Sequence, residues 1–349
     1  MIKLKKIFSL AFAGILMTSL FVGCGDSKDK PTINIFNAGD YIDPTLLKDF
    51  ERETGVKVNY ETFETNEIMY QKLKTDTSSY DLVIPSDYMV EKMIKEDMLE
   101  KIDFKNIPNY CNIDDKFKNL AFDPTNEYSV PYMWGTIGIL YNKKMVKGPI
   151  DSWDVLWDPK YKGQVFMLDA MRDSLGITLK KLGCSLNSTD SKEINEAKDE
   201  LIKQKPNVLA YVGDEVKDRM VADEAALAVI YSGDAPVLKE RNPDLEYVIP
   251  KEGTNLWFDS MVIPKGAKHK EYAEKFINFM LDPEIAKQNV EYIGYSTPNK
   301  AALELLNDDI KNDKNAYPDE GVLKKCEVFK DLGDNIKKYD EAWMEVKSN

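Results

Sequence analysis

Histidine and cysteine are both scarce in this sequence, which has one histidine, His269, and four cysteines in 349 residues. A single histidine cannot supply a histidine metal cluster or most of the acid–base machinery of enzymes. Beyond Cys24 there remain Cys111, Cys184 and Cys326, which are widely spaced and form no CxxC pair. This pattern favours free thiols over a disulfide framework or a metal site. We therefore expect no metal and no cofactor.

Catalytic motifs and long apolar runs are missing as well. The sequence contains no G-x-S-x-G, no P-loop and no zinc motif, so we expect a protein that is not an enzyme. It has no tandem repeat and no low-complexity segment. After residue 22, no apolar run is long enough to span a membrane.

Negative charge is abundant, with 60 acidic against 47 basic residues and a formal net charge of −13. Such a chain is a poor partner for nucleic acid and attracts cations. Solubility alone also explains an acidic surface, so charge by itself does not identify a ligand. The chain is 43% hydrophobic and 31% charged, as in globular proteins. Its length suits two domains better than a single core.

The first residues have the pattern of a secretory signal. Lys3, Lys5 and Lys6 precede an apolar stretch over 7–22, and Gly23 and Cys24 follow it. A small residue before a cysteine, with aliphatic residues just upstream, resembles a bacterial lipobox. The resemblance implies removal of residues 1–23, a lipid on Cys24, a polar tether over 24–31 and a place on the extracytoplasmic face of the cell membrane. The alternative is an ordinary secretory signal with a chance cysteine.

Strand and helix patterns alternate along the rest of the chain, which predicts mostly parallel sheets covered by helices. The predicted strands are 32–36, 56–61, 82–85, 164–168, 208–211 and 226–231. The predicted helices are 44–54, 66–76, 87–97, 172–182, 191–204, 270–281, 283–292, 322–330 and 335–346.

Two apolar segments, 131–142 and 257–264, are expected to cross between two domains. We therefore predict one lobe formed by 32–136 plus 262–349 and a second lobe formed by 137–261. Two crossings make a cleft with a hinge. In parallel α/β sheets, ligands bind at the carboxyl ends of strands, where polar loops follow several of the predicted strands.

Six blocks of sequence are similar to the spermidine/putrescine-binding proteins of bacterial ABC importers. They are Glu-Thr-Gly-Val-Lys-Val (53–58), Asn-Glu-Ile-Met-Tyr-Gln-Lys-Leu-Lys (66–74), Tyr-Asp-Leu-Val-Ile-Pro-Ser-Asp-Tyr (80–88), Val-Pro-Tyr-Met-Trp-Gly-Thr (130–136), Trp-Phe-Asp-Ser-Met-Val-Ile-Pro (257–264) and Ile-Gly-Tyr-Ser-Thr-Pro-Asn (293–299). The resemblance implies a two-lobed, type II periplasmic-binding-protein fold of class α/β. It also implies a polyamine ligand, a permease and its ATPase as partners, and a monomer that binds and delivers its ligand.

A polyamine has definite chemical requirements. Each protonated amine needs carboxylate or hydroxyl acceptors when it leaves water. The methylenes need apolar walls, and aromatic faces serve methylenes and cations alike. By resemblance, the ligand-binding residues are Asp40, Tyr41, Ser86, Tyr88, Asp169, Asp173, Tyr231, Asp234, Trp257, Asp259 and Tyr295. The chain departs from the family pattern at Ala38, where tryptophan is common, and near Phe329, where a spermidine binder has glutamine.

Most of these residues have a structural alternative. Asp40, Ser86 and Asp234 could cap helices, Asp169 or Asp173 could pair with Arg172, and the tyrosines could belong to the core. Asp259 is the strongest candidate, because it interrupts an apolar segment in which an acid needs a partner. A ferric-ion or sugar-binding protein could share the fold. Paired tyrosines, which would favour iron, are not present, and a sugar would need fewer acids.

The lipobox resemblance predicts the behaviour of a Cys24→Ala variant. Without the thiol, the variant should stay in the membrane fraction as precursor or be released to the medium. Cell fractionation with labelled palmitate measures this, and Cys111→Ala serves as the matched control. Normal processing and anchoring of Cys24→Ala would contradict the prediction.

Overall fold

A nine-stranded mixed sheet runs through residues 30–349, which are the part of the chain that this computed structural model describes. The strands are β1 (Thr32–Ala38), β2 (Lys57–Phe63), β3 (Leu82–Val83), β4 (Ser129–Asn142), β5 (Val165–Leu168), β6 (Val208–Val212), β7 (Leu227–Tyr231), β8 (Leu245–Val248) and β9 (Leu256–Val262). Their order is β2-β1-β3-β9-β4-β7-β5-β6, with β8 paired to β4. Cys24 and the expected signal peptide lie outside the described residues. No helix within 30–349 is both long and apolar enough to cross a membrane.

The first group of strands is parallel, as the alternating pattern predicts. Strand β1 pairs in parallel with β2 and β3. The helices between them are α1 (Pro44–Thr54), α2 (Asn66–Thr75) and α3 (Asp87–Lys95). Local sequence fixes the ends of α1, because the Asp43 side chain accepts from the Thr45 N–H at 2.8 Å and Gly55 ends the helix at φ 73°.

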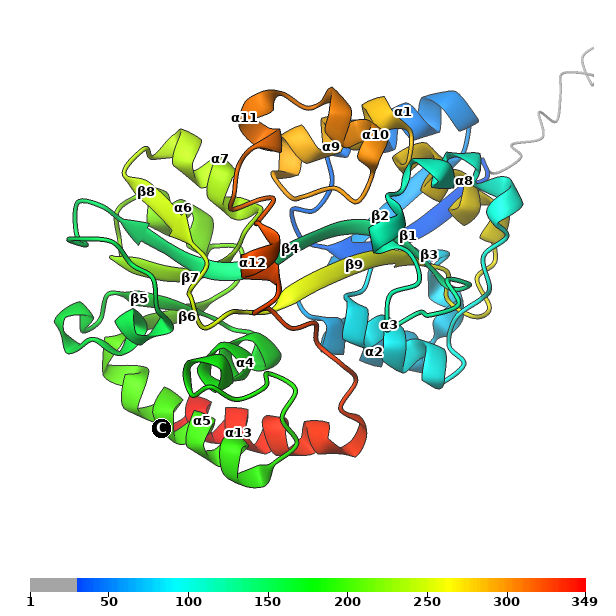
Figure 1. Cartoon of the computed structure of the whole chain (residues 1–349). Helices are drawn as coiled ribbons and strands as arrows, with labels where there is room; N and C mark the ends of the chain where they lie inside the picture. The colour runs from blue at the N-terminus through cyan, green and yellow to red at the C-terminus, as the bar shows by residue number, and fades with distance from the viewer. Residues whose placement is uncertain (1–29) are drawn as a thin grey trace, which may run out of the picture. The chain divides into compact units, whose positions relative to one another are not determined.

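The two expected crossings are the antiparallel strands β4 and β9, which run side by side through the middle of Figure 1. Their register extends from Ser129 opposite Val262 to Thr136 opposite Leu256. The second half of β4 then pairs with β7 and β8. All residues of β4 except Tyr141 are buried, which explains the continuous apolar run in its sequence.

The second group of strands repeats the parallel pattern, with β5 between β6 and β7. The helices that accompany it are α4 (Met171–Lys181), α5 (Ser191–Gln204), α6 (Val216–Val221) and α7 (Asp234–Arg241). The sequence analysis did not predict α6 or α7. Both are short, and α7 has only a weak apolar face, so periodicity gives little signal.

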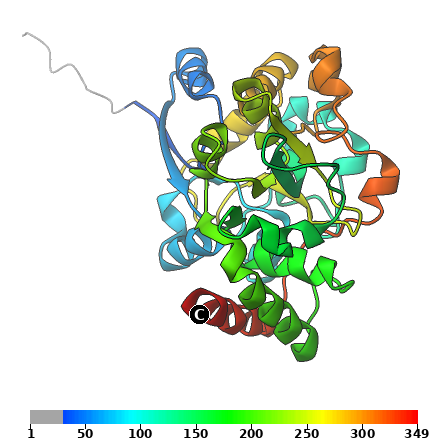
Figure 2. The same cartoon turned by 90° about the vertical axis from the view of Figure 1, so that its left-hand side faces the viewer.

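The C-terminal helices divide between the two groups of strands. They are α8 (Lys270–Met280), α9 (Pro283–Ile293), α10 (Lys300–Leu305), α11 (Asp308–Lys311), α12 (Glu320–Leu323) and α13 (Ile336–Ser348). Helix α13 packs on α4 and α5, beside which it lies in Figures 1 and 2. This contact corrects the expected extent of the first lobe, which counted all of 262–349. Hydrogen bonds such as that from the Tyr339 hydroxyl to the Ser188 carbonyl, at 2.7 Å, fix α13 there.

The helix predicted over 322–330 is wrong beyond Leu323. The chain is extended at Glu327, whose N–H donates to the Thr254 carbonyl at 3.0 Å. The Glu327 carbonyl accepts from the Leu256 N–H at 2.9 Å. Pairing with the start of β9 satisfies this backbone better than an isolated helical turn, so tertiary contacts override local propensity. Residues 324–335 thus form a third connection between the two groups of strands.

Candidate functional site

A cavity of about 700 Å³ lies between the two groups of strands and is lined by loops from both. Ten of the eleven predicted ligand-binding residues line it. They are Tyr41, Ser86, Tyr88, Asp169, Asp173, Tyr231, Asp234, Trp257, Asp259 and Tyr295. The eleventh, Asp40, is not part of the lining. The cavity also lies where the topology predicts a ligand site, at the carboxyl ends of the parallel strands.

The lining is strongly acidic. Eight carboxylates line the cavity, against one arginine, Arg172, and no lysine among the described residues. The acids are Glu64, Asp87, Asp169, Asp173, Asp214, Glu215, Asp234 and Asp259. A low-dielectric cleft lined by one sign of charge concentrates ions of the opposite sign. Such a cleft attracts cations and disfavours anions.

Asp259 lies on the crossing strand β9 and is held by one hydroxyl. The Tyr41 hydroxyl donates to Asp259 Oδ2 at 2.7 Å, while the buried Oδ1 has no hydrogen-bond partner in the described structure. Burial raises the pKa of Asp259 to about 6, although the bond from Tyr41 favours the ionised form. Trp257 places a second unpartnered polar atom, its buried Nε1, in the same lining. Buried atoms without partners are rare in proteins and indicate a place for a ligand group.

Asp173 lies in the first turn of α4, which accompanies the second group of strands. Its Oδ2 accepts from the Tyr231 hydroxyl at 2.8 Å. Burial raises the pKa of Asp173 to about 6. Within residues 30–349, neither Asp173 nor Asp259 has a lysine or arginine at ion-pair distance. Each carboxylate accepts from a neutral tyrosine hydroxyl and forms no ion pair within these residues, and the charge of the neighbouring Arg172 lowers the pKa of Asp173 without outweighing burial.

Three other acids of the lining have partners within the protein, although burial still raises the pKa of Asp234 to about 6 and the pKa of Asp87 above its usual range. The Asp234 carboxylate lies 3.4 Å from Lys217 Nζ, and it accepts from the Tyr295 hydroxyl at 3.1 Å. Asp169 forms an ion pair with Lys347 of α13 at 2.8 Å. Asp87 accepts backbone N–H groups of Tyr88 at 2.7 Å and Phe258 at 3.0 Å, which join α3 to β9. A structural role therefore accounts for Asp87.

Aromatic rings build the wall between the two free carboxylates. The Trp257 ring meets Tyr231 edge-on at 6.1 Å and Tyr295 at 5.5 Å between centroids. Tyr41 meets Tyr295 edge-on at 5.1 Å. Edge-to-face pairs of this kind rigidify a wall and leave ring faces available to methylenes and cations.

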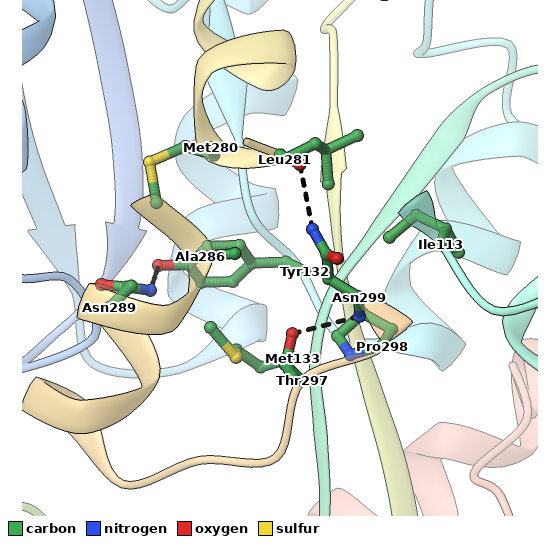
Figure 3. A pocket seen from close by; sticks show the side chains of 10 residues that line it. All are labelled: Ile113, Tyr132, Met133, Met280, Leu281, Ala286, Asn289, Thr297, Pro298 and Asn299. Atoms are coloured by element: carbon green, nitrogen blue, oxygen red, sulfur yellow. Dashed lines mark hydrogen bonds between the residues drawn. The ribbon is translucent and has the colours of Figure 1, made fainter. Parts of the chain in front are cut away.

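A chain of buried hydrogen bonds positions Tyr41, and Figure 3 shows its first bond, between Asn289 and Tyr132. Asn289 on α9 donates from Nδ2 to the Tyr132 hydroxyl at 2.9 Å, and this hydroxyl donates to the Tyr41 carbonyl at 2.6 Å. Asn289 Oδ1 accepts from the Asp43 N–H at 2.9 Å. Asn289 and Tyr132 line a separate cavity of about 10 Å³, room for one water at most. They act on the large cavity through Tyr41.

Arg172 closes one end of the large cavity. Its guanidinium stacks over the Phe329 ring at 4.4 Å and the Tyr88 ring at 5.4 Å. It donates to the Lys330 carbonyl at 3.2 Å and to Asn187 at 3.1 Å, rather than pairing with Asp169 or Asp173. Arg172 thereby anchors the connection over 324–335. From the sequence, Arg172 is expected only as a possible salt-bridge partner of Asp169 or Asp173. The residues near 324–335 show no pattern that predicts their extended course or their contact with Arg172.

None of Asp40, Ser86 and Asp234 caps a helix with its side chain in the structure. Asp43, not Asp40, caps α1, and Asp40 is a largely exposed residue in the left-handed region at φ 44°. Ser86 sits at the N-cap of α3 without capping it, and its Oγ accepts from Asn66 at 3.0 Å. Asp234 opens α7 after the N-cap residue Gly233.

Comparison with known proteins agrees with this architecture. Residues 45–318 match the model of a family described as bacterial extracellular solute-binding protein. The spermidine/putrescine-binding periplasmic protein of Salmonella typhimurium is 43% identical over 341 residues, which are 97% of each chain. The substrate-binding protein of a spermidine/putrescine ABC transporter from Streptococcus pneumoniae is 46% identical, with a TM-score of 0.79 over 91% of this chain and 99% of the other.

A lipoprotein of Treponema pallidum is 29% identical, with a TM-score of 0.81 over 91% of this chain and the whole of the other. These relatives confirm the two-lobed, type II fold and the class of protein that the sequence predicts. The chain belongs to the bacterial extracellular solute-binding protein family.

Proposed function

We propose that this chain captures a polyamine, such as spermidine or putrescine, and delivers it to an ABC importer. One observation carries the proposal. Two half-buried carboxylates, Asp173 and Asp259, line an aromatic cavity and form no ion pair with a lysine or arginine within residues 30–349. Removing an ionised carboxylate from water is strongly unfavourable unless a cation compensates it. A ligand with two or more ammonium groups supplies that compensation at both places.

The aromatic wall supports the same ligand class. A polyamine is a chain of methylenes between ammonium groups, and Trp257 with Tyr231 and Tyr295 offers ring surface between the two acids. A neutral sugar would leave the acids without charge compensation. The Salmonella relative is described as binding spermidine and putrescine, and the Streptococcus relative as the substrate-binding protein of a spermidine/putrescine transporter. We assign the same ligand class to this chain because its acids and aromatic rings match the ammonium groups and methylenes of a polyamine.

The proposal extends to the cellular setting. The two lobes close on the ligand about β4 and β9, a hinge motion of the kind used by periplasmic binding proteins. The closed form docks on a permease driven by an ATPase, and the chain itself catalyses no reaction. It works as a monomer on the extracytoplasmic face of the membrane, held by a lipid on Cys24. A relative from Treponema pallidum is itself described as a lipoprotein.

The Asp259→Asn variant tests the proposed contact. The amide keeps the shape and can still accept from Tyr41, but it removes the charge. Affinity for spermidine should fall by about ten- to hundredfold, the size of a hydrogen bond to a charged group. Calorimetric titration at pH 7.5 measures the loss. The ligand-free variant should melt within a few degrees of the parent, because loss of the Asp259 charge leaves no cation of the protein without an ion-pair partner.

The control for this test is Asp334→Asn, which removes an equal charge from a side chain that is 98% exposed. It should bind spermidine as the parent does. Should Asp259→Asn melt far below the parent yet retain parental affinity, Asp259 would be a structural acid and not part of the binding site.

Binding should also depend on pH. The pKa values of Asp173 and Asp259 are about 6 in the ligand-free protein. A bound ammonium favours the ionised form and lowers these pKa values, so below pH 6 each carboxyl must lose a proton for binding. Affinity should thus be constant above pH 7 and fall below pH 6, by up to roughly tenfold per pH unit for each acid.

Titrations with spermidine between pH 7.5 and 5.0 measure this dependence, with circular dichroism to verify folding at each pH. The Asp259→Asn variant should show a shallower slope than the parent. Affinity that stays flat over the whole range would contradict a binding site made of these two acids.

A further inference from the structure

One lysine of the protein, Lys217, forms an ion pair with Asp234, a buried acid of the cavity lining. Lys217 extends from α6, and its Nζ lies 3.1 Å from Asp214, 3.4 Å from Asp234 and 3.4 Å from Asp40. Asp214 and Asp234 line the large cavity, and the Asp234 side chain is only 7% exposed. The burial of Lys217 alone would lower its pKa, but the three carboxylates outweigh this and raise it. Lys217 therefore stays an ammonium.

The surroundings hold this ammonium in place. Asp40 comes from the loop after β1 and Asp214 from the loop after β6, so Lys217 joins the two sides of the cleft. Gly39 lets these loops approach, because a Cβ at that position would lie 2.8 Å from Asp214 Oδ2. The Tyr295 hydroxyl donates to the same Asp234 oxygen that faces Lys217. One oxygen of Asp234, Oδ1, thus faces both a cation and a hydroxyl donor of the protein itself.

We propose that Lys217 is a specificity-determining residue, whose ammonium takes the place of a ligand ammonium at Asp234 and limits the charged contacts of the cleft to Asp173 and Asp259. This inference rests on the proposed polyamine function. A lysine ammonium and a polyamine ammonium are the same chemical group, so both compete for one carboxylate. The lysine is tethered, and its effective concentration exceeds that of a free ligand. A ligand gains nothing at Asp234 from a further ammonium.

The number of ammonium groups then has little influence on affinity beyond the first two. The diamine putrescine can satisfy Asp173 and Asp259, and the extra ammonium of spermine meets an acid that is already paired. Removal of the Lys217 charge opens Asp234 and Asp214 to that extra ammonium. The expected signature is a change in selectivity between polyamines, not a uniform change in affinity.

The Lys217→Met variant provides the test. Methionine keeps the length and the apolar stem of the side chain but has no charge. Putrescine, spermidine and spermine are titrated into the parent and the variant by calorimetry at pH 8, where Asp234 is ionised. We expect the ratio of the putrescine to the spermine dissociation constant to rise on the order of tenfold in the variant, as for one added charge-assisted contact.

Two further variants serve as controls. Lys217→Arg keeps the cation and should keep the parental ratio. Lys192→Met removes an equal charge from a side chain that is 83% exposed on α5, and should also leave the ratio unchanged. If Lys217→Met does not fold, Lys217→Gln, which keeps a hydrogen-bond donor for Asp234, replaces it in the same titrations.

The titrations distinguish failure of the proposed role of Lys217 from failure of the proposed polyamine function. An unchanged ratio, or an equal loss for all three ligands, would overturn the specificity role and leave Lys217 as a structural tie between the two sides of the cleft. Failure of the parent protein to bind any of the three polyamines would instead overturn the proposed function, and the inference about Lys217 with it.

Discussion

The proposed binding site depends on two half-buried carboxylates, Asp173 and Asp259, that form no ion pair within the described residues. Burial raises the pKa of Asp173 and of Asp259 to about 6, as it does that of Asp234, because the charged form is unfavourable in the cavity. Asp234 and Asp169 pair with lysines, and Asp87 accepts backbone N–H groups. A diffusing cation thus finds a generally attractive cleft, in whose wall Asp173 and Asp259 have no lysine or arginine of residues 30–349 at ion-pair distance. Affinity and selectivity follow from the same arrangement.

The rest of the fold positions those two acids. Asp259 lies on β9, which pairs with β4 and with the segment after β3. Its partner Tyr41 is fixed from behind by Tyr132 and Asn289, so the site rests on three elements that are far apart in sequence. Such support matters because water would stabilise the charge of a carboxylate that can rotate into solvent, and a ligand ammonium would then add little. A rigid wall keeps the charge buried until a ligand arrives.

Much of this architecture could be predicted from local sequence. The alternation of strands and helices, the two apolar crossings and an acid inside one of them are patterns that a single sequence displays. The choice of Asp259 followed from its place between Phe258 and Met261, where an unpaired acid is anomalous. Ten of the residues chosen by resemblance line one cavity. Their convergence could be predicted from the order of the motifs, because the fold brings the carboxyl ends of the strands together.

The features that the sequence does not predict share one physical cause, which is partners that are distant in sequence. Asp40 is a candidate by resemblance, and its ion pair with Lys217, 177 residues away, has no local signal. The extended course at Glu327 depends on the edge of β9, and the docking of α13 depends on α4 and α5. Nothing near Phe329 predicts that Arg172 will stack on it. Local propensity and motif position carry no information about such contacts, and these contacts decide which acids are free to bind a ligand.

The most direct test of the account is a crystal structure of the complex with spermidine. The account predicts one ligand nitrogen within about 3 Å of an Asp259 oxygen and another within about 3 Å of Asp173, the distance of a charge-assisted hydrogen bond. The methylenes between them should lie against Trp257, and Lys217 should still contact Asp234. A ligand nitrogen on Asp234 with Lys217 displaced, or a ligand that contacts neither Asp173 nor Asp259, would contradict it.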